Sequence, residues 1–393
     1  MTFGFTIGKS DAETAARIGV LRTARGEVNT PVFMPVGSQA TVKTLTPEDI
    51  HSLGYSLILC NSYHLYLRPG TEVVQRLGGL HRFMAWDGPI LTDSGGYQLF
   101  SLSPLARVSE EGVRFRSHID GSEHFLTPEG VMELEQALGA DIIMAFDQPP
   151  RHQDTIEEAR RATERTHRWA ERCLRRLSPT GQALFGIAQG GMFPELRRES
   201  ARFMVSLGFP GYAIGGLSLG EDKETTYAMA GETVALLPAD KPRYLMGVGS
   251  PEDLLQAVSL GVDMFDSALP TRVARNGALF TGSGRQNMRN ARYKFQEGPI
   301  DPACGCYTCR HFSAAYLYHL FHSQELLAYR LATLHNLQFI GDLMAGIRKS
   351  IAEGRFADFK KEFLSKYEIT DQDARVAQKK KWLARQEGKN EEG

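Results

Sequence analysis

Residues 141–147 read DIIMAFD, and two further runs of the same kind follow, LFGIAQ at 184–189 and GYAIGG at 211–216. These runs are apolar with little alternation, as expected for strands of a parallel sheet that is buried on both faces. Parallel neighbours must be joined by long crossover connections, which are usually helices. This part of the chain therefore predicts an α/β fold with a parallel sheet.

Five more runs extend the series in both directions. They are PVFMPV (31–36), SLILC (56–60), PILTD (89–93), RYLMGV (243–248) and VDMFD (262–266). Helix starts are readable between them, because Thr155 and Glu158 form a capping box and Ser250 precedes a proline at a first helical position. Eight strands with helical crossovers fit a (β/α)8 TIM barrel better than an open sheet.

The remaining segments are expected to add to this barrel. The gap between Asp93 and Asp141 requires an insertion near residues 99–126, and GVRFRSHIDGSEHFL (112–126) predicts a β-hairpin that turns at Asp120 and Gly121. We expect residues 1–295 to form a catalytic barrel. Residues 296–375, which contain three closely spaced cysteines and several histidines, are expected to form a zinc-binding subdomain with closing helices. Residues 376–393, with three lysines at 379–381, are expected to be a frayed charged tail.

The composition excludes several classes of protein. Of 393 residues, 42% are hydrophobic and 23% charged, and 45 basic against 46 acidic residues give a net charge of −1. A disordered chain would be further from neutrality, and a protein that holds nucleic acid by bulk charge would be strongly basic. No apolar run reaches about 18 residues, and the N-terminus lacks the pattern of a secretory signal. We therefore expect a soluble, cytoplasmic protein.

Polar residues or glycine stand at the ends of several predicted strands. They are Asp93, Asp147, Gln189, Gly216 and Asp266. A TIM barrel carries its chemistry at the C-terminal ends of its strands, so these residues are expected to share one pocket. A single aspartate there would more simply bind a nearby backbone amide, but three carboxylates and an amide at equivalent positions favour a site.

Two kinds of chemistry fit this set. Paired carboxylates suit the breaking of a glycosidic bond, in which one attacks the sugar and the other transfers a proton. A further aspartate, a glutamine and a glycine amide match the Watson–Crick edge of guanine, which donates from N1 and N2 and accepts at O6. The pairs Gly95-Gly96 and Gly215-Gly216 are either turn residues or backbone drawn up to a flat ligand.

Three cysteines lie within six residues of the chain, and several histidines follow. In a chain without secretory features, such a cluster favours metal binding over disulfides. Three thiolates and one imidazole would complete a tetrahedral Zn²⁺ site without an open position, which is a structural role. The predicted ligands are Cys304, Cys306, Cys309 and His335, and on spacing alone the alternatives for the fourth are His311, His319 and His322. An iron–sulfur cluster would more often require a fourth cysteine.

A basic segment follows Asp266. Residues 267–296 contain no acidic residue and six basic ones, Arg272, Arg275, Arg285, Arg289, Arg292 and Lys294. Without these six, the remainder of the chain would have a net charge of about −7. Charge runs are usually solvated surfaces, but this one joins a predicted catalytic strand end to the cysteine cluster. We interpret it as a site that holds the phosphates of a substrate.

The chain closely resembles the tRNA-guanine transglycosylases of the bacterial queuine tRNA-ribosyltransferase type. The resemblance runs from about Phe5 to the final helix and is carried by LTDSGGYQ (91–98), FGIAQGG (185–191), IGGLSLGE (214–221), YLMGVG (244–249), FDSALPTR (265–272) and the cysteine and histidine set. It implies a homodimeric, zinc-containing barrel that exchanges the wobble guanine of certain tRNAs for a 7-deazaguanine in queuosine biosynthesis. Archaeal relatives carry extra C-terminal RNA-binding domains, which we do not expect here.

The resemblance also implies roles for individual residues. Asp266 would attack ribose C1′ and form a covalent tRNA–enzyme intermediate, and Asp93 would protonate the departing guanine and deprotonate the incoming base. The base would be bound by Ser94, Gly95, Gly96, Tyr97, Asp147, Gln189, Gly216, Leu217 and Met246. The RNA would be contacted by Gly247, Val248, Gly249, Ser250, Pro251, Glu252 and Asp253 and by Thr271, Arg272, Val273, Ala274 and Arg275.

Two positions depart from the family pattern. Pro149 stands where bacterial members usually have a cysteine, and Leu219 stands where members that accept queuine tend to have glycine. The bulky leucine favours the smaller 7-aminomethyl-7-deazaguanine as the incoming base. The alternatives are queuine as the preferred base, a glycoside or nucleoside hydrolase, and an inactive RNA-binding relative. The last should lack a carboxylate, whereas Asp93 and Asp266 are both present.

Overall fold

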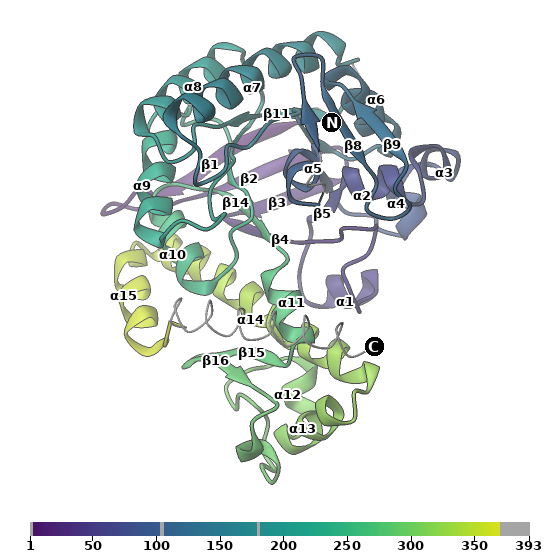
Figure 1. Ribbon diagram of the computed structural model, residues 1–393. Helices are drawn as coiled ribbons and strands as arrows, with labels where there is room; N and C mark the ends of the chain where they lie inside the picture. The colour runs from purple at the N-terminus through teal and green to yellow at the C-terminus, as the bar shows by residue number, and fades with distance from the viewer. Residues whose placement is uncertain (1–2, 103–105, 179–180, 370–393) are drawn as a thin grey trace. The chain divides into compact units, whose positions relative to one another are not determined.

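The computed structural model describes residues 3–102, 106–178 and 181–369. The described chain forms two compact units (Figure 1). One consists of the residues up to 272 together with 340–357, and the other of residues 273–339 together with those from 358 onward. The domain limits expected from the sequence stay a prediction, and the charged tail expected at 376–393 lies outside the described residues.

The first unit contains a closed barrel of eight parallel strands. Each predicted apolar run overlaps one strand. The ends of the sheet are joined by a bridge between Val36 and Leu59 and by a 2.6 Å hydrogen bond from Gly37 N to Leu59 O. In their order around the barrel the strands are β4 (Val32–Pro35), β14 (Met264–Ser267), β13 (Arg243–Leu245), β12 (Tyr212–Ile214), β11 (Ala183–Ala188), β10 (Ile142–Met144), β6 (Ile90–Asp93) and β5 (Ile58–Asn61). The predicted TIM barrel is confirmed.

Helices alternate with these strands along the chain. They are α1 (Pro47–Ser52), α2 (Ser62–Leu67), α3 (Thr71–Arg76), α4 (Gly79–Met84), α5 (Gly96–Leu102), α6 (Pro128–Leu138), α7 (Ile156–Arg176), α8 (Pro194–Ser206), α9 (Lys223–Val234), α10 (Pro251–Ser259) and α11 (Leu269–Arg275). The predicted capping box of α7 is present, because Glu158 N donates to Thr155 Oγ1 at 3.3 Å and Thr155 N donates to the Glu158 carboxylate at 2.8 Å. Helix α10 begins at the predicted Pro251.

A three-stranded antiparallel sheet, which the sequence analysis did not predict, covers one end of the barrel. It consists of β1 (Gly4–Ser10), β2 (Arg17–Thr23) and β3 (Gly26–Thr30). Leu21 and Val28 of this sheet are buried in one cluster with Ile142, Ala183 and Met264, which are the first residues of three barrel strands. The sheet therefore closes the N-terminal end of the barrel and leaves the C-terminal strand ends for a site.

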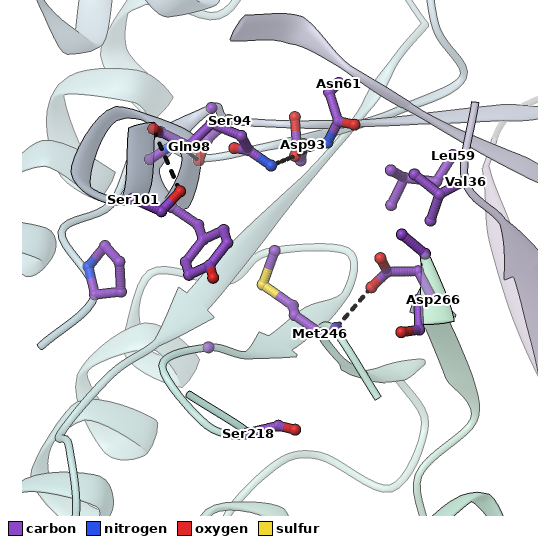
Figure 2. A pocket seen from close by; sticks show the side chains of 18 of the residues that line it. Val36, Leu59, Asn61, Asp93, Ser94, Gln98, Ser101, Ser218, Met246 and Asp266 are labelled. Carbon is purple, nitrogen blue, oxygen red and sulfur yellow. Dashed lines mark hydrogen bonds between the residues drawn. The ribbon is translucent and has the colours of Figure 1, made fainter. Parts of the chain in front are cut away.

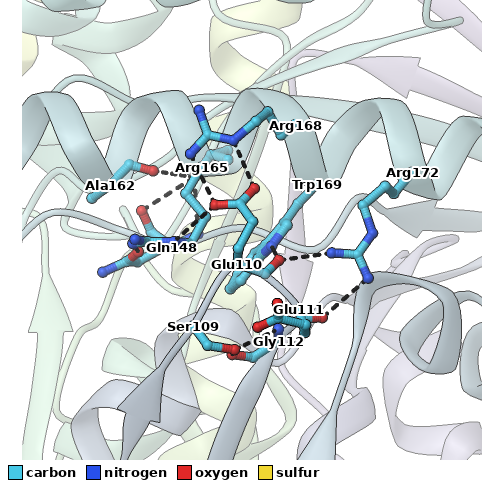
Figure 3. A network of polar contacts seen from close by, with 11 residues as sticks. Ser109, Glu110, Glu111, Gly112, Gln148, Ala162, Arg165, Arg168, Trp169 and Arg172 are labelled. Carbon is cyan, nitrogen blue, oxygen red and sulfur yellow. Dashed lines mark hydrogen bonds and ion pairs between the residues drawn. The ribbon is translucent and has the colours of Figure 1, made fainter.

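The predicted hairpin insertion is confirmed, and it has a third strand. The sheet consists of β7 (Arg107–Val108), β8 (Val113–Arg116) and β9 (Glu123–Leu126). Glu110, between β7 and β8, lies against helix α7 (Figure 3). Its carboxylate accepts a 2.6 Å hydrogen bond from Arg168, and its backbone oxygen accepts from Trp169 Nε1 at 2.9 Å and from Arg172 at 2.8 Å. These contacts fix the insertion to the helix that follows β10.

The second unit contains a hairpin and several helices around a core of its own. The elements are β15 (Ala278–Thr281), β16 (Gly284–Asn287), the short 3-10 helix η1 (Ala291–Tyr293), α12 (Tyr307–His311) and α13 (Ala314–His322). Helix α14 (Leu326–Glu353) begins in this unit, and α15 (Phe356–Lys366) ends in it. In the part of the chain that the structure describes, no helix is long and apolar enough to cross a membrane.

Candidate active site and metal centre

A cavity of about 500 Å³ lies at the C-terminal ends of the barrel strands (Figure 2). Its lining includes all of the strand-end residues singled out in the sequence, Asp93, Asp147, Gln189, Gly216 and Asp266. These residues come from five different strands or the loops that directly follow them. The structure therefore brings the predicted polar set together, in a cavity of the size that small-molecule sites usually have.

Asp266, on β14, is held through one of its two carboxylate oxygens. Oδ1 accepts hydrogen bonds from the Tyr244 hydroxyl at 2.6 Å and from Gly247 N at 2.8 Å. Burial raises the pKa of Asp266 above its ordinary value, and these two hydrogen bonds oppose that rise. Since neither of them uses Oδ2, this oxygen is available to act on a ligand as a nucleophile.

Asp93, at the end of β6, is more deeply buried and accepts three hydrogen bonds. The Asn61 amide and Gln98 Nε2, the latter at 2.8 Å, donate to Oδ2, and Ser62 N donates to Oδ1 at 3.1 Å (Figure 2). Burial raises the pKa of Asp93 to about 7, and the negative charge of Asp266 adds to the rise. A carboxyl group with such a pKa can both give and take a proton at neutral pH.

Asp147 and Gln189 form a buried polar pair on the same cavity. Asp147 Oδ1 accepts from Ser94 Oγ at 2.9 Å, and Oδ2 accepts from Gln189 Nε2 at 2.7 Å. Burial raises the pKa of Asp147 to about 6. A carboxylate oxygen can accept more than one hydrogen bond, and an amide nitrogen has two hydrogens. Asp147 and Gln189 can therefore still accept hydrogen bonds from a ligand and donate hydrogen bonds to it.

Gly96 and both glycines of the pair Gly215-Gly216 lie against this polar pair, and the approach of their backbone to a flat ligand stays a prediction. A Cβ on Gly96 would lie 2.5 Å from Asp147 Oδ1. A Cβ on Gly215 or Gly216 would overlap the side-chain amide of Gln189. Close approach of the backbone to polar side chains therefore requires glycine at these three positions.

The predicted apolar faces and base-binding backbone also line the cavity. Tyr97 is 52% exposed, whereas Met246 is partly buried against the core of the barrel. Ser94, Gly95 and Leu217 complete the predicted base-binding set at this cavity. The two residues that depart from the family pattern, Pro149 and Leu219, also line the cavity.

Several lining residues were not singled out in the sequence. Asn61 and Gln98 hold Asp93, and Tyr244 holds Asp266. Asn61 directly follows the predicted run SLILC, and Gln98 ends the motif LTDSGGYQ, so their positions were a usable signal. Tyr244 begins the motif YLMGVG, but an aromatic residue within a strand is ordinarily part of the core, so its contact with Asp266 was not expected.

The predicted RNA-contacting residues are unevenly exposed. Gly247 and Arg272 are exposed and line the cavity. By contrast, Val248 and Glu252 are only 3% and 7% exposed. Lys223 Nζ forms ion pairs with Glu252 at 2.5 Å and with Asp253 at 2.6 Å, so both acids are bound to helix α9. The basic residues beyond Arg272 belong to the second unit. Contact with RNA stays a prediction for these segments.

The second unit contains the cluster of potential metal ligands that the cysteines predicted. The ligand atoms of Cys304, Cys306, Cys309 and His335 all lie within 4.8 Å of one another. Cys306 Sγ and Cys309 Sγ are 3.5 and 3.3 Å from His335 Nδ1. His335 Nε2 is 2.6 Å from Phe280 O, which assigns the ring proton to Nε2 and leaves Nδ1 to bind a metal ion. Three sulfurs and one nitrogen fit a tetrahedral ion.

Comparison with known proteins identifies the family. A family described as queuine tRNA-ribosyltransferase matches residues 11–369. A protein named queuine tRNA-ribosyltransferase from Dehalococcoides mccartyi strain BAV1 is 57% identical over 383 residues, which are 98% of this chain and 98% of the relative. One of the same name from Pelotomaculum thermopropionicum is 57% identical over 368 residues, 94% of this chain and 100% of the relative. The chain belongs to the queuine tRNA-ribosyltransferase family.

Membership of the queuine tRNA-ribosyltransferase family confirms the resemblance drawn from the sequence motifs, and with it the expectation of an enzyme of this family. A third relative with this name, from Desulforamulus reducens, is 57% identical over 358 residues, 91% of this chain and 97% of the relative. The match extends over the barrel and over all four potential metal ligands.

Proposed function

We propose that the protein is a pentosyltransferase of queuosine biosynthesis that exchanges the guanine at the anticodon wobble position of tRNA for a 7-deazaguanine. The observation that carries the proposal is the pair Asp93 and Asp266, two carboxyl groups in different environments that line one cavity with a guanine-matching polar set. Membership of the queuine tRNA-ribosyltransferase family supports it.

In the first half of the exchange, the wobble nucleotide leaves its stack and its base enters the cavity. Asp266 attacks C1′ of the ribose through Oδ2, while Tyr244 and Gly247 hold Oδ1. The bond between C1′ and N9 breaks, and its electron pair leaves with guanine. Asp93, whose raised pKa keeps much of it protonated at neutral pH, supplies the proton that guanine takes up.

In the second half, the incoming base gives its N9 proton to the Asp93 carboxylate. Its N9 attacks C1′ and displaces Asp266, which regains its free carboxylate. Two displacements at C1′ retain the configuration of the ribose, as in other double displacements through a carboxylate. Water has no part in the balance of either step, so the outcome is exchange rather than hydrolysis.

Base recognition follows from the polar pair behind the carboxylates. Asp147 accepts from the N1 and N2 hydrogens of the base, and Gln189 and the Gly216 N–H donate to O6. Tyr97 and Met246 lie on the two faces of the ring. The Ser94 hydroxyl, which donates to Asp147 Oδ1, keeps the carboxylate turned toward the ligand.

The preferred incoming base is 7-aminomethyl-7-deazaguanine. Leu219 lines the cavity in the loop after β12, and we expect its bulky side chain to leave less room for the larger substituent of queuine. Pro149 lines the cavity beside Asp147, whereas the Gln148 side chain accepts a 2.6 Å hydrogen bond from Arg165 of α7 (Figure 3). At the two positions that depart from the family pattern, Pro149 and Leu219, the pocket is therefore lined by side chains that form no hydrogen bonds.

The remaining expectations concern partners and the metal. We propose that the exposed Arg272 and the basic segment bind phosphates of the tRNA, that the protein acts as a homodimer, and that it works in the cytoplasm. Cys304, Cys306, Cys309 and His335 would hold one Zn²⁺ ion per subunit. With four protein ligands, the ion would cross-link the second unit and take no part in the chemistry.

The test is exchange of labelled guanine into a tRNA that carries a wobble guanine, compared with the same tRNA carrying adenine at that position. The wild-type protein should incorporate label only into the first and should form a denaturant-stable adduct with it. Asp266→Asn should bind the tRNA with little change and form no adduct. Release of guanine from the tRNA without incorporation of label, which leaves an abasic site, would indicate a hydrolase, and an adduct that survives Asp266→Asn would contradict the nucleophile.

A further inference from the structure

We infer that Arg197 is a positioning residue for base recognition, because its guanidinium fixes the peptide groups that aim the Gly216 N–H into the cavity. The inference rests on the proposed function, in which this N–H donates to O6 of the base. Arg197 belongs to helix α8, is 0% exposed, and lies behind the loop that follows β12.

Arg197 is buried among backbone carbonyl groups. Nε donates to Gly191 O at 2.8 Å, Nη1 donates to Gly215 O at 2.7 Å, and Nη2 donates to Gly216 O at 3.3 Å. A buried guanidinium is costly unless its hydrogens are satisfied, so these carbonyl groups make its burial possible. Burial lowers the pKa of Arg197 to about 9, which leaves the group charged at neutral pH. The charge in turn strengthens its hold on each carbonyl.

Because the peptide group is planar, the hydrogen bond to the Gly215 carbonyl also fixes the direction of the Gly216 N–H. In a planar trans peptide, the carbonyl oxygen of one residue and the N–H of the next point in opposite directions. The Gly215 carbonyl points at Arg197, so the Gly216 N–H points away from it. Gly216 lines the cavity and Arg197 does not, so the side away from Arg197 is the side of the cavity. The same reasoning applies to the Gly216 carbonyl and the Leu217 N–H.

The loop needs such a support because of its glycines. Gly216 has a φ of 68°, in the region that glycine adopts most readily, and Gly215 precedes it. Two adjacent glycines would let the peptide between them rotate with little steric resistance. The hydrogen bond from the rigid, planar guanidinium to Gly215 O restrains this peptide, and the one to Gly216 O restrains the next. Arg197 therefore organises the N–H before a base arrives, as sites that recognise a carbonyl oxygen require.

A second residue of α8 supports the neighbouring donor. Ser200, one turn after Arg197, accepts a 3.0 Å hydrogen bond from Gln189 N, and its hydroxyl is 2.9 Å from His167 Nε2. The same face of the helix thus fixes the backbone at both residues that donate to O6. Arg198, the next residue, points elsewhere and forms a 2.6 Å ion pair with Glu232 of α9. It is a matched control on the same helix.

The experiment compares two bases in equilibrium binding to the full-length protein. 2-Aminopurine lacks O6, and its fluorescence reports its own binding; guanine is measured by its displacement. Arg197→Lys keeps the charge but loses the planar fork, and should weaken guanine binding about tenfold, while 2-aminopurine binding changes less than about twofold. Arg198→Lys should change neither.

The outcomes separate positioning from general support of the fold. Equal weakening of both bases, or no weakening of either, would overturn the inference. Arg197→Gln, which keeps two donors without the charge, serves as a second variant, and thermal unfolding of each protein checks that it is folded. Guanine exchange into tRNA by the same proteins distinguishes the two proposals. Absence of exchange by the wild type defeats the proposed function, whereas the binding ratio still decides the role of Arg197.

Discussion

The Tyr244 hydroxyl donates a 2.6 Å hydrogen bond to Asp266 Oδ1 across the neighbouring strands β13 and β14. Tyr244 is 0% exposed, so this hydroxyl has little access to water as an alternative partner. Together with Gly247 N it occupies one oxygen of the proposed nucleophile and leaves the other for C1′. The tyrosine therefore sets the orientation of the carboxylate and also favours its ionised form.

Tyr244→Phe keeps the shape of the buried side chain and removes this hydrogen bond. We expect adduct formation with tRNA to slow about tenfold, equivalent to about 1.4 kcal/mol, because a hydrogen bond to a charged group is lost and the pKa of Asp266 rises further. Single-turnover formation of the adduct measures the effect, with tRNA affinity as the control that should stay within about twofold. An unchanged rate would show that Gly247 N alone orients the carboxylate.

Guanine affinity should depend on the protonation of Asp147. Burial raises the pKa of Asp147 to about 6 from its ordinary value of 3.8, so the carboxylate that accepts from the base is present above pH 6 and lost below it. Affinity should thus be constant between pH 7 and 8 and weaken toward pH 5. Binding to Asp147→Asn, which has no proton to gain, should be weaker throughout and nearly flat over the same range. A wild-type profile that is equally flat would contradict the role of Asp147 as acceptor.

The rate of adduct formation should fall on the alkaline side. Asp93 has its pKa raised to about 7, so the acid that protonates the departing guanine is present below pH 7 and is lost as the pH rises through it. Above pH 8 the single-turnover rate should decrease about tenfold per pH unit, the slope for loss of one proton. Asp93→Asn should remove this dependence and most of the rate. The measurement is best made with saturating tRNA, so that binding does not contribute to the profile.

Leu219→Gly should change the choice of incoming base. Removal of the side chain enlarges the cavity beside Gly216, so incorporation of queuine should rise about tenfold relative to 7-aminomethyl-7-deazaguanine. Competition of the two bases for one tRNA measures the ratio directly. Guanine exchange is the control, because guanine has no substituent at that position and should be affected little. If the ratio stays the same, the discrimination does not lie in Leu219.

Metal binding should stabilise the second unit. Cys306→Ser should lose most of the bound zinc and unfold at a lower temperature, because a structural zinc site contributes folding free energy. His311→Ala is the matched control: His311 was an alternative ligand on spacing, but its Nδ1 is 2.8 Å from Tyr307 O and it lies outside the cluster. Metal analysis and thermal unfolding of both variants decide the matter. Full zinc content in Cys306→Ser would contradict the predicted site.

The barrel was predictable because its strands are short and apolar on both faces. The strands β10, β11 and β12, which overlap DIIMAFD, LFGIAQ and GYAIGG, are buried along their whole length, so their apolar composition reveals them. The sheet β1–β3 was missed for the opposite reason. Its strands GFTIGKS and RIGVLRT are partly exposed and rich in glycine, threonine and basic residues, and only side chains such as Leu21 reach the core.

The site was predictable where a residue's position along its strand carried the signal, as for Asp93 and Asp266. The residues that support the site without lining the cavity were not predictable. Arg197 reads as one of several charged residues on a surface helix, and nothing in the spacing of α8 shows that it is buried. Glu252 and Asp253 were predicted to contact RNA, which stays a prediction, and the sequence did not show that both acids pair with Lys223. Burial and pairing of charges depend on the tertiary fold.

The sheet that closes the N-terminal end of the barrel has a consequence for the order of events in the proposed exchange. Among the residues that the structure describes, Leu21 and Val28 pack with the first residues of the strands, and the cavity lies at the opposite, C-terminal strand ends. In the proposed exchange, the tRNA would cover these strand ends while its ribose is bound to Asp266. Guanine therefore has to leave, and its replacement to enter, past an RNA that is still attached. The shape of this entrance would then affect the release of guanine and the entry of its replacement, rather than bond formation at C1′.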